Sequence, residues 1–245
     1  MRVPISRVAV PVHGPLVSSR FVRRHNRFLL QVALDDSGEA VDAHMADPGR
    51  LRELLLPGRR VWLRRASGSS RKTRWTAVLV EISEGPELVS LDTTLPNRLI
   101  RRALEEEALT EVAGWSLVRA EFPVGRSRLD FLLADRTGRR MAMEVKSVTL
   151  VEDGMALFPD AVTERGARHV KELGRLARLA EWEAAVLFVV QRSDAREVRA
   201  ARRIDPKFAE ALKEARLSGL RVLGRRCHVF PDRVELGSAL PADVG

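Results

Sequence analysis

The 245-residue sequence predicts an α/β (α+β) protein in two parts, a β-rich barrel over residues 1–85 and a mixed sheet flanked by helices over residues 86–245. Short strand-like runs fill the first part, and helices alternate with strands in the second. The composition shifts at Glu84-Gly85-Pro86, a stretch typical of a hinge. Short strands joined by turns favour a barrel, whereas strands separated by helices favour a sheet covered by helices.

The N-terminal part contains five strand-like runs between turn residues. They are Arg7–Val12, Arg20–Leu34, Val41–His44, Arg59–Arg65 and Thr73–Glu81. Midway, Asp47 is suited to cap a helix that has Pro48 at its first position, three leucines between residues 51 and 55 as its apolar stripe, and Pro57-Gly58 at its end. One small helix among short strands favours an OB-like β-barrel, although a split β-sandwich would give a similar pattern.

The C-terminal part alternates between helical and strand-like segments. The expected helices are Pro96–Leu109, Thr163–Trp182 and Asp205–Ser218. The expected strands are Ser116–Val124, Ser127–Ala134, Arg140–Val148, Ala184–Gln191, Leu220–Leu223 and Cys227–Leu236. The run Ala184–Gln191 is almost continuously apolar, as expected of a strand covered on both faces. This order predicts a mixed sheet flanked by helices.

The composition narrows the class of protein. Apolar residues make up 45% and charged residues 31% of the chain, a globular balance. The longest apolar run, Ala184–Val190, is too short to span a bilayer, and Pro4 and Pro11 interrupt the N-terminal apolar stretch, so we expect no membrane contact and no signal peptide. Because Cys227 is the only cysteine, no internal disulfide can form. We expect a cytoplasmic protein of open oligomeric state.

The net charge of +9 is concentrated near the N-terminus. Residues 1–85 hold 15 Lys and Arg against 8 Asp and Glu, a surplus of +7. A basic surface attracts phosphate backbones. Coding bias toward arginine (37 Arg, 5 Lys) would also raise the charge, but it does not explain why acids are scarce here. The basic side chains of this part that we expect to bind DNA are Arg23, Arg27, Arg71, Lys72 and Arg74.

Two neighbouring strands carry acids within apolar runs. Glu144 and Lys146 share one face of their strand, and a turn at Gly138 would fold the preceding strand back so that Asp130 lies beside Glu144. Two nearby carboxylates repel unless they share a cation, and hard oxygen ligands suit Mg²⁺ or Mn²⁺. Such a site could activate water against a phosphodiester, with Lys146 positioning the water or stabilising charge. A structural Glu–Lys pair is the simpler alternative.

This motif resembles that of the restriction-endonuclease-like PD-(D/E)xK superfamily, in which an Asp precedes a Glu-x-Lys. Longer segments closely resemble the sugar fermentation stimulation protein A family: Glu144–Leu150, Phe158–Gly166, His169, His44–Leu51 and Arg71–Thr73. The resemblance implies a DNA-binding protein with an OB-like N-terminal part and a nuclease-like C-terminal part, linked by name to sugar utilisation. Many members carry Asn-Thr-Gly where this chain has Asp47-Pro48-Gly49, which puts any role of that Asn in doubt.

The resemblance also implies further site residues. The superfamily usually adds an acid from the first helix, and Glu107 lies nearest the apolar stripe of the expected helix, although the helix could fray before it. Related nucleases use a Gln at the end of the next strand, a position held here by Gln191, whose simpler role is a strand-end hydrogen bond. We therefore expect the catalytic set to be Asp130, Glu144, Lys146, Glu107 and Gln191, with the metal on Asp130 and Glu144.

The helix expected over residues 163–182 carries a basic face. Arg165 and His169 near its start could reach a phosphate at the site. Arg168 and Lys171 recur at helical spacing, and we expect them to bind DNA, although a solvated helix face is the commoner explanation. A surface role is likewise the ordinary reading of His169.

Two classes of function stay open at this point. One is metal-dependent phosphodiester hydrolysis of DNA, which the complete set Asp130, Glu144 and Lys146 favours. The other is a non-catalytic DNA-binding protein or transcriptional regulator of sugar metabolism with a nuclease-like fold, which the description of the family favours. Single-stranded, duplex and branched DNA are not distinguished by the sequence, and RNA is a third alternative.

Overall fold

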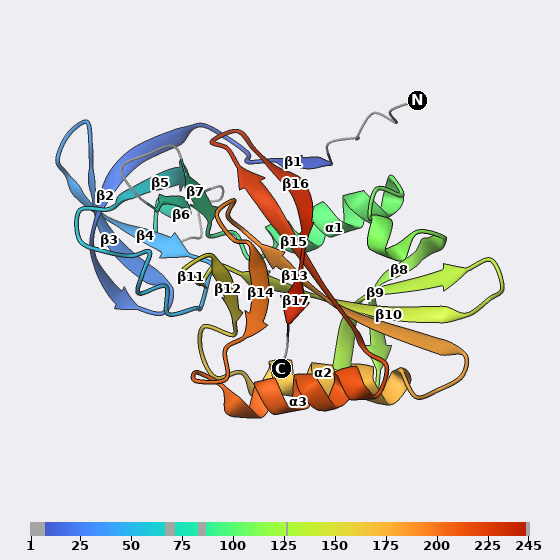
Figure 1. The fold of residues 1–245 in the computed structure, drawn as a ribbon. Coiled ribbons are helices and arrows are strands. Elements are labelled where there is room, and N and C mark those ends of the chain that lie inside the picture. Colours follow the sequence, from blue (N-terminus) through green and yellow to red (C-terminus); the bar gives the residue numbers. More distant parts are fainter. Residues whose placement is uncertain (1–7, 67–71, 83–86, 126, 244–245) are drawn as a thin grey trace.

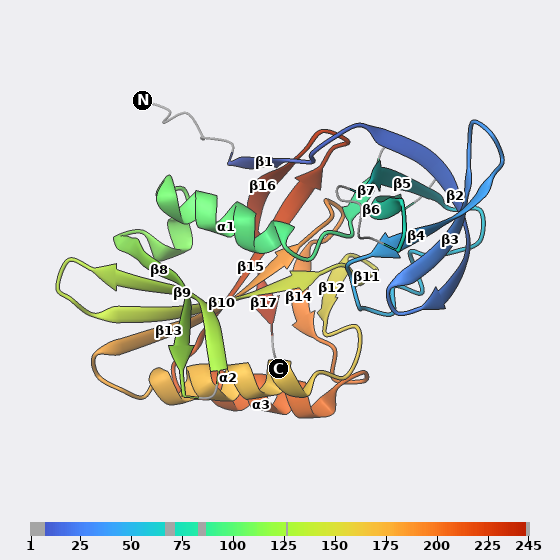
Figure 2. The same cartoon turned by 180° about the vertical axis from the view of Figure 1, so that it is seen from behind.

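The computed structural model describes residues 8–66, 72–82, 87–125 and 127–243, which form two sheet-based halves (Figures 1 and 2). Strands β2–β7 gather on one side of the molecule, and the remaining strands and all three α-helices make up the other side. The expected fold class, an OB-like barrel followed by a helix-flanked mixed sheet, is confirmed. Within the described residues, no helix has the length and apolar character needed to cross a membrane.

The N-terminal barrel is closed by five strands. Its sheet has the order β4-β3-β2-β5-β6-β7, and an additional parallel pairing of β4 with β6 closes the ring. The strands are β2 (Leu16–Asn26), β3 (Leu29–Leu34), β4 (Ala40–Met45), β5 (Arg60–Arg65), β6 (Trp75–Glu81) and β7 (Leu88–Ser90). Two register shifts in β2 let this long strand bend around the barrel. Alternate residues such as Leu30, Val32 and Val61 fill the interior.

The C-terminal half is built on a seven-stranded mixed sheet of order β1-β16-β15-β13-β10-β9-β8. The pairs β10–β13 and β13–β15 are parallel, and the others are antiparallel. The strands are β1 (Ala9–Pro11), β8 (Trp115–Val124), β9 (Ser127–Asp135), β10 (Arg140–Val148), β13 (Trp182–Val190), β15 (Arg221–Val229) and β16 (Arg233–Leu240). The central strand β13 is buried on both faces, as its apolar run predicts.

Helices cover both faces of this sheet. Helix α1 (Leu95–Glu105) packs with Met143, Val145 and Leu187 on one face. Helices α2 (Glu164–Leu176) and α3 (Pro206–Leu217) lie side by side under the other face (Figure 1). A short 3-10 helix, Thr110–Val112, follows α1. A second, four-stranded sheet was not expected from the sequence: β11 (Val151–Glu152), β12 (Met155–Phe158), β14 (Glu197–Ala200) and β17 (Ala242–Asp243).

The two sheets do not divide the chain at a single residue. Strand β1, within the expected barrel segment Arg7–Val12, pairs with β16 of the C-terminal sheet instead. Strand β7, which follows residue 85, pairs with β6 of the barrel. The expected run Arg20–Leu34 is a hairpin, β2 and β3, rather than one strand. Residues 83–86 lie outside the described part, so the expected boundary at 85/86 stays a prediction.

The helix expected to begin at Asp47 is absent, so that prediction was wrong. Its capping bond does form, because the Gly49 N–H donates to Asp47 Oδ1 at 2.7 Å. The Arg50 N–H then donates across to Asp160 Oδ2 of the C-terminal half at 2.9 Å, and Leu51 takes a positive φ of 48°. A left-handed residue ends helical propagation. The long-range contact therefore overrides the local signal, although the three leucines are buried as expected.

Several expected boundaries in the C-terminal half were also wrong. Helix α2 ends at Leu176 rather than Trp182, because Trp182 begins β13 and pairs with Arg140. The predicted strands 220–223 and 227–236 are a different pair, β15 and β16, with the turn at Pro231-Asp232. Arg225 lies between the two expected strands but belongs to β15, and its guanidinium pairs with Glu111 within the fold. A partner far along the chain therefore supports the charge within a strand.

Candidate functional site

Asp130 lies where β9 and β10 separate. The two strands pair as far as Phe131 and Met143, and the Asp130 side chain then occupies the position of the next inter-strand bond. The Val145 N–H donates to Asp130 Oδ2 at 2.7 Å, and Asn97 Nδ2 of α1 donates to Oδ1 at 2.8 Å. Burial, together with the charge of nearby Glu144, raises the pKa of the Asp130 carboxyl to about 6. The hairpin thus brings Asp130 and Glu144 together.

Only one oxygen of the Glu144 carboxylate has hydrogen-bond partners among the described residues. Its side chain is buried, and Oε1 accepts from both Lys146 Nζ and His169 Nδ1, each at 2.6 Å. Burial acts to raise the pKa of Glu144, but the hydrogen bond from His169 and the charge of Lys146 outweigh it, so the pKa lies below its usual value. Among the described residues, none donates to the buried Oε2. One oxygen of a buried carboxylate is therefore available to another ligand.

His169 orients Glu144 rather than facing solvent. It lies on α2 and only 2% of its surface is exposed. Because a carboxylate only accepts, Nδ1 carries the proton in its bond to Glu144. Arg165 Nε then lies 3.4 Å from Nε2 as a donor. These contacts fix both the ring and the carboxylate. The alternative of an ordinary surface position for His169 was wrong, because the α2 face that meets β10 buries the ring, whereas its expected role in DNA binding stays a prediction.

Glu107 is not brought to this site. Helix α1 ends at Glu105, and Glu107 is exposed with a positive φ of 51°, so the expectation that it faces inward was wrong. Asn97, the helical residue that does contact Asp130, lies in the first turn of α1, at the opposite end of the helix from Glu107. No motif pointed to Asn97, because its role depends on where α1 crosses the sheet.

Gln191 lies on the other side of β10. Its Nε2 donates to Ser147 Oγ at 2.8 Å, and its backbone N–H donates to Val148 O. Ser147 is three residues from Glu144 in the same strand, so the two side chains point to opposite faces. The Gln191 carbonyl oxygen is buried without a partner in the described structure. The position matches the strand-end bond better than a place beside Glu144.

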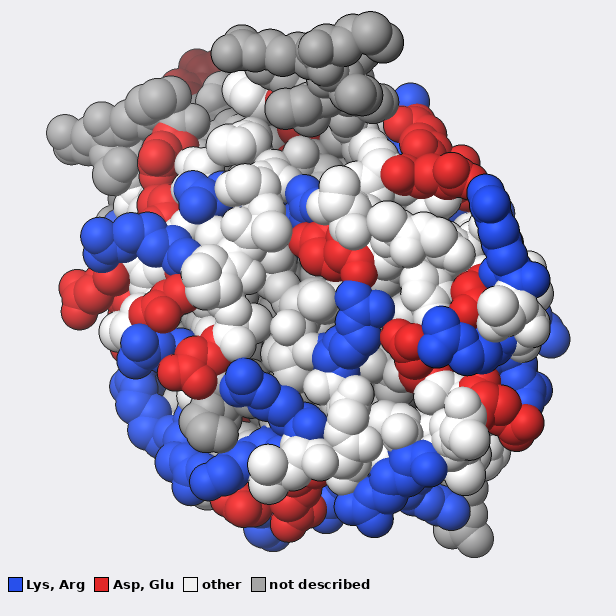
Figure 3. Space-filling model, turned by 45° about the vertical axis from the view of Figure 1, so that its right-hand side comes forward, with Lys and Arg blue, Asp and Glu red and all other residues white. Residues whose placement is uncertain are grey.

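The expected DNA-binding residues are dispersed. Arg23, Arg27, Lys72 and Arg74 are exposed on the barrel, and Arg71 lies outside the described residues. The helical residues Arg165, Arg168 and Lys171 are exposed on α2. On the face seen in Figure 3, basic and acidic side chains are interspersed rather than sorted into one uninterrupted basic patch. The expected DNA-binding residues therefore lie on both halves, and the face in Figure 3 does not gather them into one patch.

A groove between α2 and α3 also mixes charges. Arg168 and Lys171 line it together with acidic side chains of both helices, which are Glu164, Glu172, Glu210 and Glu214. Acids beside a basic stripe weaken its attraction for phosphate. We therefore expect Arg168 and Lys171 to attract phosphate less strongly than the basic residues of the barrel do.

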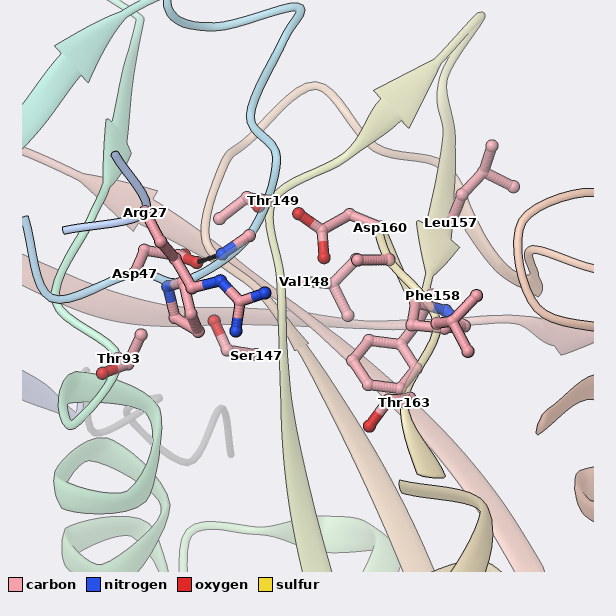
Figure 4. A pocket seen from close by; sticks show the side chains of 15 residues that line it. Arg27, Asp47, Thr93, Ser147, Val148, Thr149, Leu157, Phe158, Asp160 and Thr163 are labelled. Atoms are coloured by element: carbon pink, nitrogen blue, oxygen red, sulfur yellow. Dashed lines mark hydrogen bonds between the residues drawn. The ribbon is translucent and has the colours of Figure 1, made fainter. Parts of the chain in front are cut away.

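A pocket of about 390 Å³ opens between the barrel and the C-terminal half. Figure 4 shows Arg27 and Asp47 on one side of the end of β10, and Asp160, Phe158 and Thr163 on the other. Gly49 has no room for a side chain, because a Cβ would collide with the Asp160 carboxylate. The segments 44–51 and 158–166, both of which resemble segments of the family, therefore meet at this pocket.

Asp47 in this pocket is expected to make stability depend on pH. Burial, with the charge of Asp160 and against the charge of Arg24, raises its pKa to about 6. The folded state then binds more protons than the unfolded state between about pH 4 and 6, so stability falls as pH rises through this range. Two pKa units correspond to roughly 3 kcal/mol. Urea unfolding of Asp47→Asn should show a gain of about 1–3 kcal/mol over wild type at pH 8 that vanishes near pH 4.

The matched control for this measurement is Asp36→Asn, which removes an exposed carboxylate. Its stability should differ little from wild type at either pH. Equal stability of Asp47→Asn and wild type at pH 8 would show that burial of the Asp47 charge costs the fold nothing.

The residues around Glu144 fit a hard divalent cation. The buried carboxylate of Glu144 and the half-buried carboxylate of Asp130 lie close together, and one Glu144 oxygen has no partner in the described part. Carboxylate oxygens with room for water are the ligands that Mg²⁺ and Mn²⁺ favour. No group of three or more His, Cys, Asp or Glu with metal-binding geometry occurs among the described residues, so water or a phosphate oxygen would have to complete the coordination.

A closed OB-like barrel joined to a mixed sheet, with an Asp and a Glu-x-Lys on adjacent strands, defines a two-part protein with a nuclease-like C-terminal fold. Family models match residues 22–91, described as the "SfsA N-terminal OB domain", and residues 94–233, described as the "Sugar fermentation stimulation protein RE domain". The chain therefore belongs to the sugar fermentation stimulation protein family.

Individual relatives cover almost the whole chain. A sugar fermentation stimulation protein homolog of Shouchella clausii is 45% identical over 230 residues, which are 94% of this chain and 98% of the relative. The homolog of Chloroflexus aurantiacus is 42% identical over 98% of this chain and 89% of its own. The solved structure of Pyrococcus furiosus SfsA in complex with Ca²⁺ is 31% identical, covers 94% of this chain and 97% of its own, and has a TM-score of 0.83.

Proposed function

We propose that this protein binds DNA and hydrolyses phosphodiester bonds with a divalent cation, Mg²⁺ or Mn²⁺, held by Asp130 and Glu144. The observation that carries the proposal is the buried Oε2 of Glu144, which has no partner among the described residues and lies close to the half-buried carboxylate of Asp130. A purely structural Glu–Lys pair would leave no reason to bury that oxygen unsatisfied, since an unpaired buried polar atom costs about 1–3 kcal/mol.

Each neighbouring side chain has a separate role in this proposal. Asp130 is positioned by Asn97 and the Val145 N–H, and Glu144 by His169. Lys146 Nζ can donate to the attacking water or to the phosphate oxygen on which negative charge develops. The cation, when bound, would neutralise phosphate charge and lower the pKa of water. The Ca²⁺ complex of the Pyrococcus furiosus relative supports the choice of a hard divalent cation.

One observation favours the alternative of a non-catalytic DNA-binding protein, including a transcriptional regulator of sugar metabolism. Lys146 Nζ donates to Glu144, and Asn97 and the Val145 N–H donate to Asp130. These bonds already stabilise part of the acidic charge without a metal. A binder would use the same groups as one more contact for phosphate. Since fold alone does not decide between these functions, the cation and the cleavage step must be measured.

Metal binding is expected to depend on Glu144. Titration calorimetry with Mn²⁺ should give one site in the micromolar to millimolar range, typical of carboxylate sites that retain water. Glu144→Gln should weaken it by about tenfold or more, because one of two anionic ligands is lost. The exposed Glu105→Gln variant serves as the control and should match wild type. Superimposable curves for Glu144→Gln and wild type would remove the metal from the proposal.

DNA affinity is expected to fall steeply with salt and to depend on the barrel. Each phosphate contact contributes about 0.9 to the slope of log K against log salt for duplex DNA and about 0.7 for single strands. Arg23 and Arg74 are exposed on the barrel, so replacing each with alanine should lower the slope by about that amount. Arg136→Ala, at the far β9–β10 turn, removes the same charge as a control. Equal slopes for all three variants would show that the barrel does not contact DNA.

A further inference from the structure

The pocket between the two halves lies at the end of the strand that carries Glu144. Ser147, Val148 and Thr149 form its floor, three to five residues beyond Glu144, or about 10–16 Å at 3.3 Å per residue. The opposite wall runs through Thr163, six residues before His169 on the same helical segment. A strand of DNA whose phosphate lies at Glu144 would therefore extend over this pocket within a few nucleotides.

The pocket has the size and shape of a site for one small ligand. Its volume of about 390 Å³ lies within the range of small-molecule sites. It is complete only when both halves are present, since Arg27 and residues 47–49 come from the barrel and residues 147–149 and 157–163 from the C-terminal half (Figure 4). A ligand in it would contact both halves at once.

The lining groups match a nucleotide rather than a stretch of backbone. Arg27 places a guanidinium in the pocket, suited to a phosphate. The carboxylates of Asp47 and Asp160 would repel phosphate, but they can accept hydrogen bonds from the amino groups of bases. Phe158 offers an aromatic surface to a base. Arg27 on one side of the pocket therefore offers a contact to a phosphate, and Asp160 and Phe158 on the other side offer contacts to a base.

The hydroxyl group of Ser147, in the floor of the pocket, is also available as a hydrogen-bond donor. Ser147 Oγ accepts from Gln191 Nε2 at 2.8 Å, which leaves its own proton without a partner among the described residues. Gln191 is fully buried, and its hydrogen bond holds the Ser147 hydroxyl in place. This bond gives Gln191 an indirect part in the pocket, although it lies on the face opposite to Glu144.

We propose that this pocket binds one unpaired nucleotide of the DNA strand, with its phosphate on Arg27 and its base amino group on Asp160. The inference rests on the proposed DNA binding and specifies its substrate class as single-stranded or branched DNA. In a duplex the Watson–Crick edge is already paired and stacked, so a base enters such a pocket only when it is unpaired or flipped out. Cytosine, adenine and guanine carry an exocyclic amino group, whereas thymine does not.

The test measures affinity without catalysis. Fluorescently labelled oligo(dC) and oligo(dT) of equal length are titrated with the full-length protein in EDTA. Oligo(dC) should bind about fivefold or more tightly than oligo(dT), the effect of one base contact worth about 1 kcal/mol. Asp160→Asn should reduce or reverse this preference, because its amide can still accept from the Arg50 N–H while turning a donor toward the base.

Two exposed arginines, one in the pocket and one far from it, provide the matched comparison. Arg27→Ala should lower affinity for both oligonucleotides by about tenfold, since a charge-assisted phosphate contact is worth about 1.5–3 kcal/mol. Arg136→Ala removes the same charge at the β9–β10 turn, the opposite end of β10 from the pocket, and should cost about threefold or less. Both side chains are exposed, so these variants test the pocket even if Asp160→Asn does not fold.

The outcomes separate this inference from the nuclease proposal. Equal binding of oligo(dC) and oligo(dT), together with equal losses for Arg27→Ala and Arg136→Ala, would overturn the pocket and leave cleavage untouched. A base preference that disappears in Asp160→Asn would support the pocket even if the protein cleaves no substrate.

Discussion

Replacement of Glu144 by glutamine should abolish metal-dependent cleavage of DNA while leaving the fold intact. The glutamine carbonyl can still accept from His169 Nδ1 and Lys146 Nζ, so the local hydrogen bonds survive. The negative charge is lost, and an amide N–H₂ replaces the free Oε2 as a donor that cannot ligate a cation. We expect turnover to fall by about 10³ or more, with slightly tighter DNA binding because repulsion of phosphate is removed.

Cleavage and affinity of this variant are best measured in the same buffer, with circular dichroism as a check on folding. Glu105→Gln, an exposed acid on α1, is the matched control and should behave as wild type. Cleavage by Glu144→Gln at the wild-type rate would place the reacting phosphate elsewhere in the molecule.

Replacement of Lys146 by alanine should slow cleavage by about 10² or more with DNA affinity changed by no more than about threefold. Lys146 is mostly buried with its Nζ 2.6 Å from Glu144 Oε1, so it can contribute little to the diffuse attraction of DNA. A group that acts mainly on charge developing in the transition state changes the rate constant rather than the affinity. Single-turnover rates and equilibrium binding separate the two effects.

Lys171→Ala provides the comparison, because it removes an exposed lysine of α2 from the groove beside α3. It should weaken binding modestly and leave the single-turnover rate unchanged. If Lys146→Ala instead weakens binding in proportion to cleavage, Lys146 is one phosphate contact among others and the non-catalytic alternative gains support.

Local patterns predicted the parts of this protein that depend on neighbouring residues in the chain. Alternation of side chains put Glu144 and Lys146 on one face, and the turn at Gly138 produced the hairpin that brings Asp130 to them. The apolar run after residue 183 correctly predicted a strand buried on both faces. These features depend on residues that are close together in the chain, so they can be predicted from a single sequence.

Contacts between distant segments account for what the sequence did not reveal. The bond from Arg50 N–H to the Asp160 carboxylate replaced an expected helix with a turn, although Asp47 formed its capping bond. Asn97 and His169 reach the site only because α1 and α2 cross β10 from opposite faces. Their positions follow from helix packing against the sheet, which no local spacing encodes.

The most direct measurement is a cleavage assay of wild type and Glu144→Gln with Mg²⁺, Mn²⁺ or EDTA on single-stranded, duplex and branched DNA. We predict that wild type cuts at least one of these substrates with a divalent cation, does not cut in EDTA, and loses this activity in Glu144→Gln. Wild type that stays inert on every substrate with either cation, while Glu144→Gln binds DNA more tightly than wild type, would contradict the proposed hydrolysis and establish the site as a DNA-binding surface.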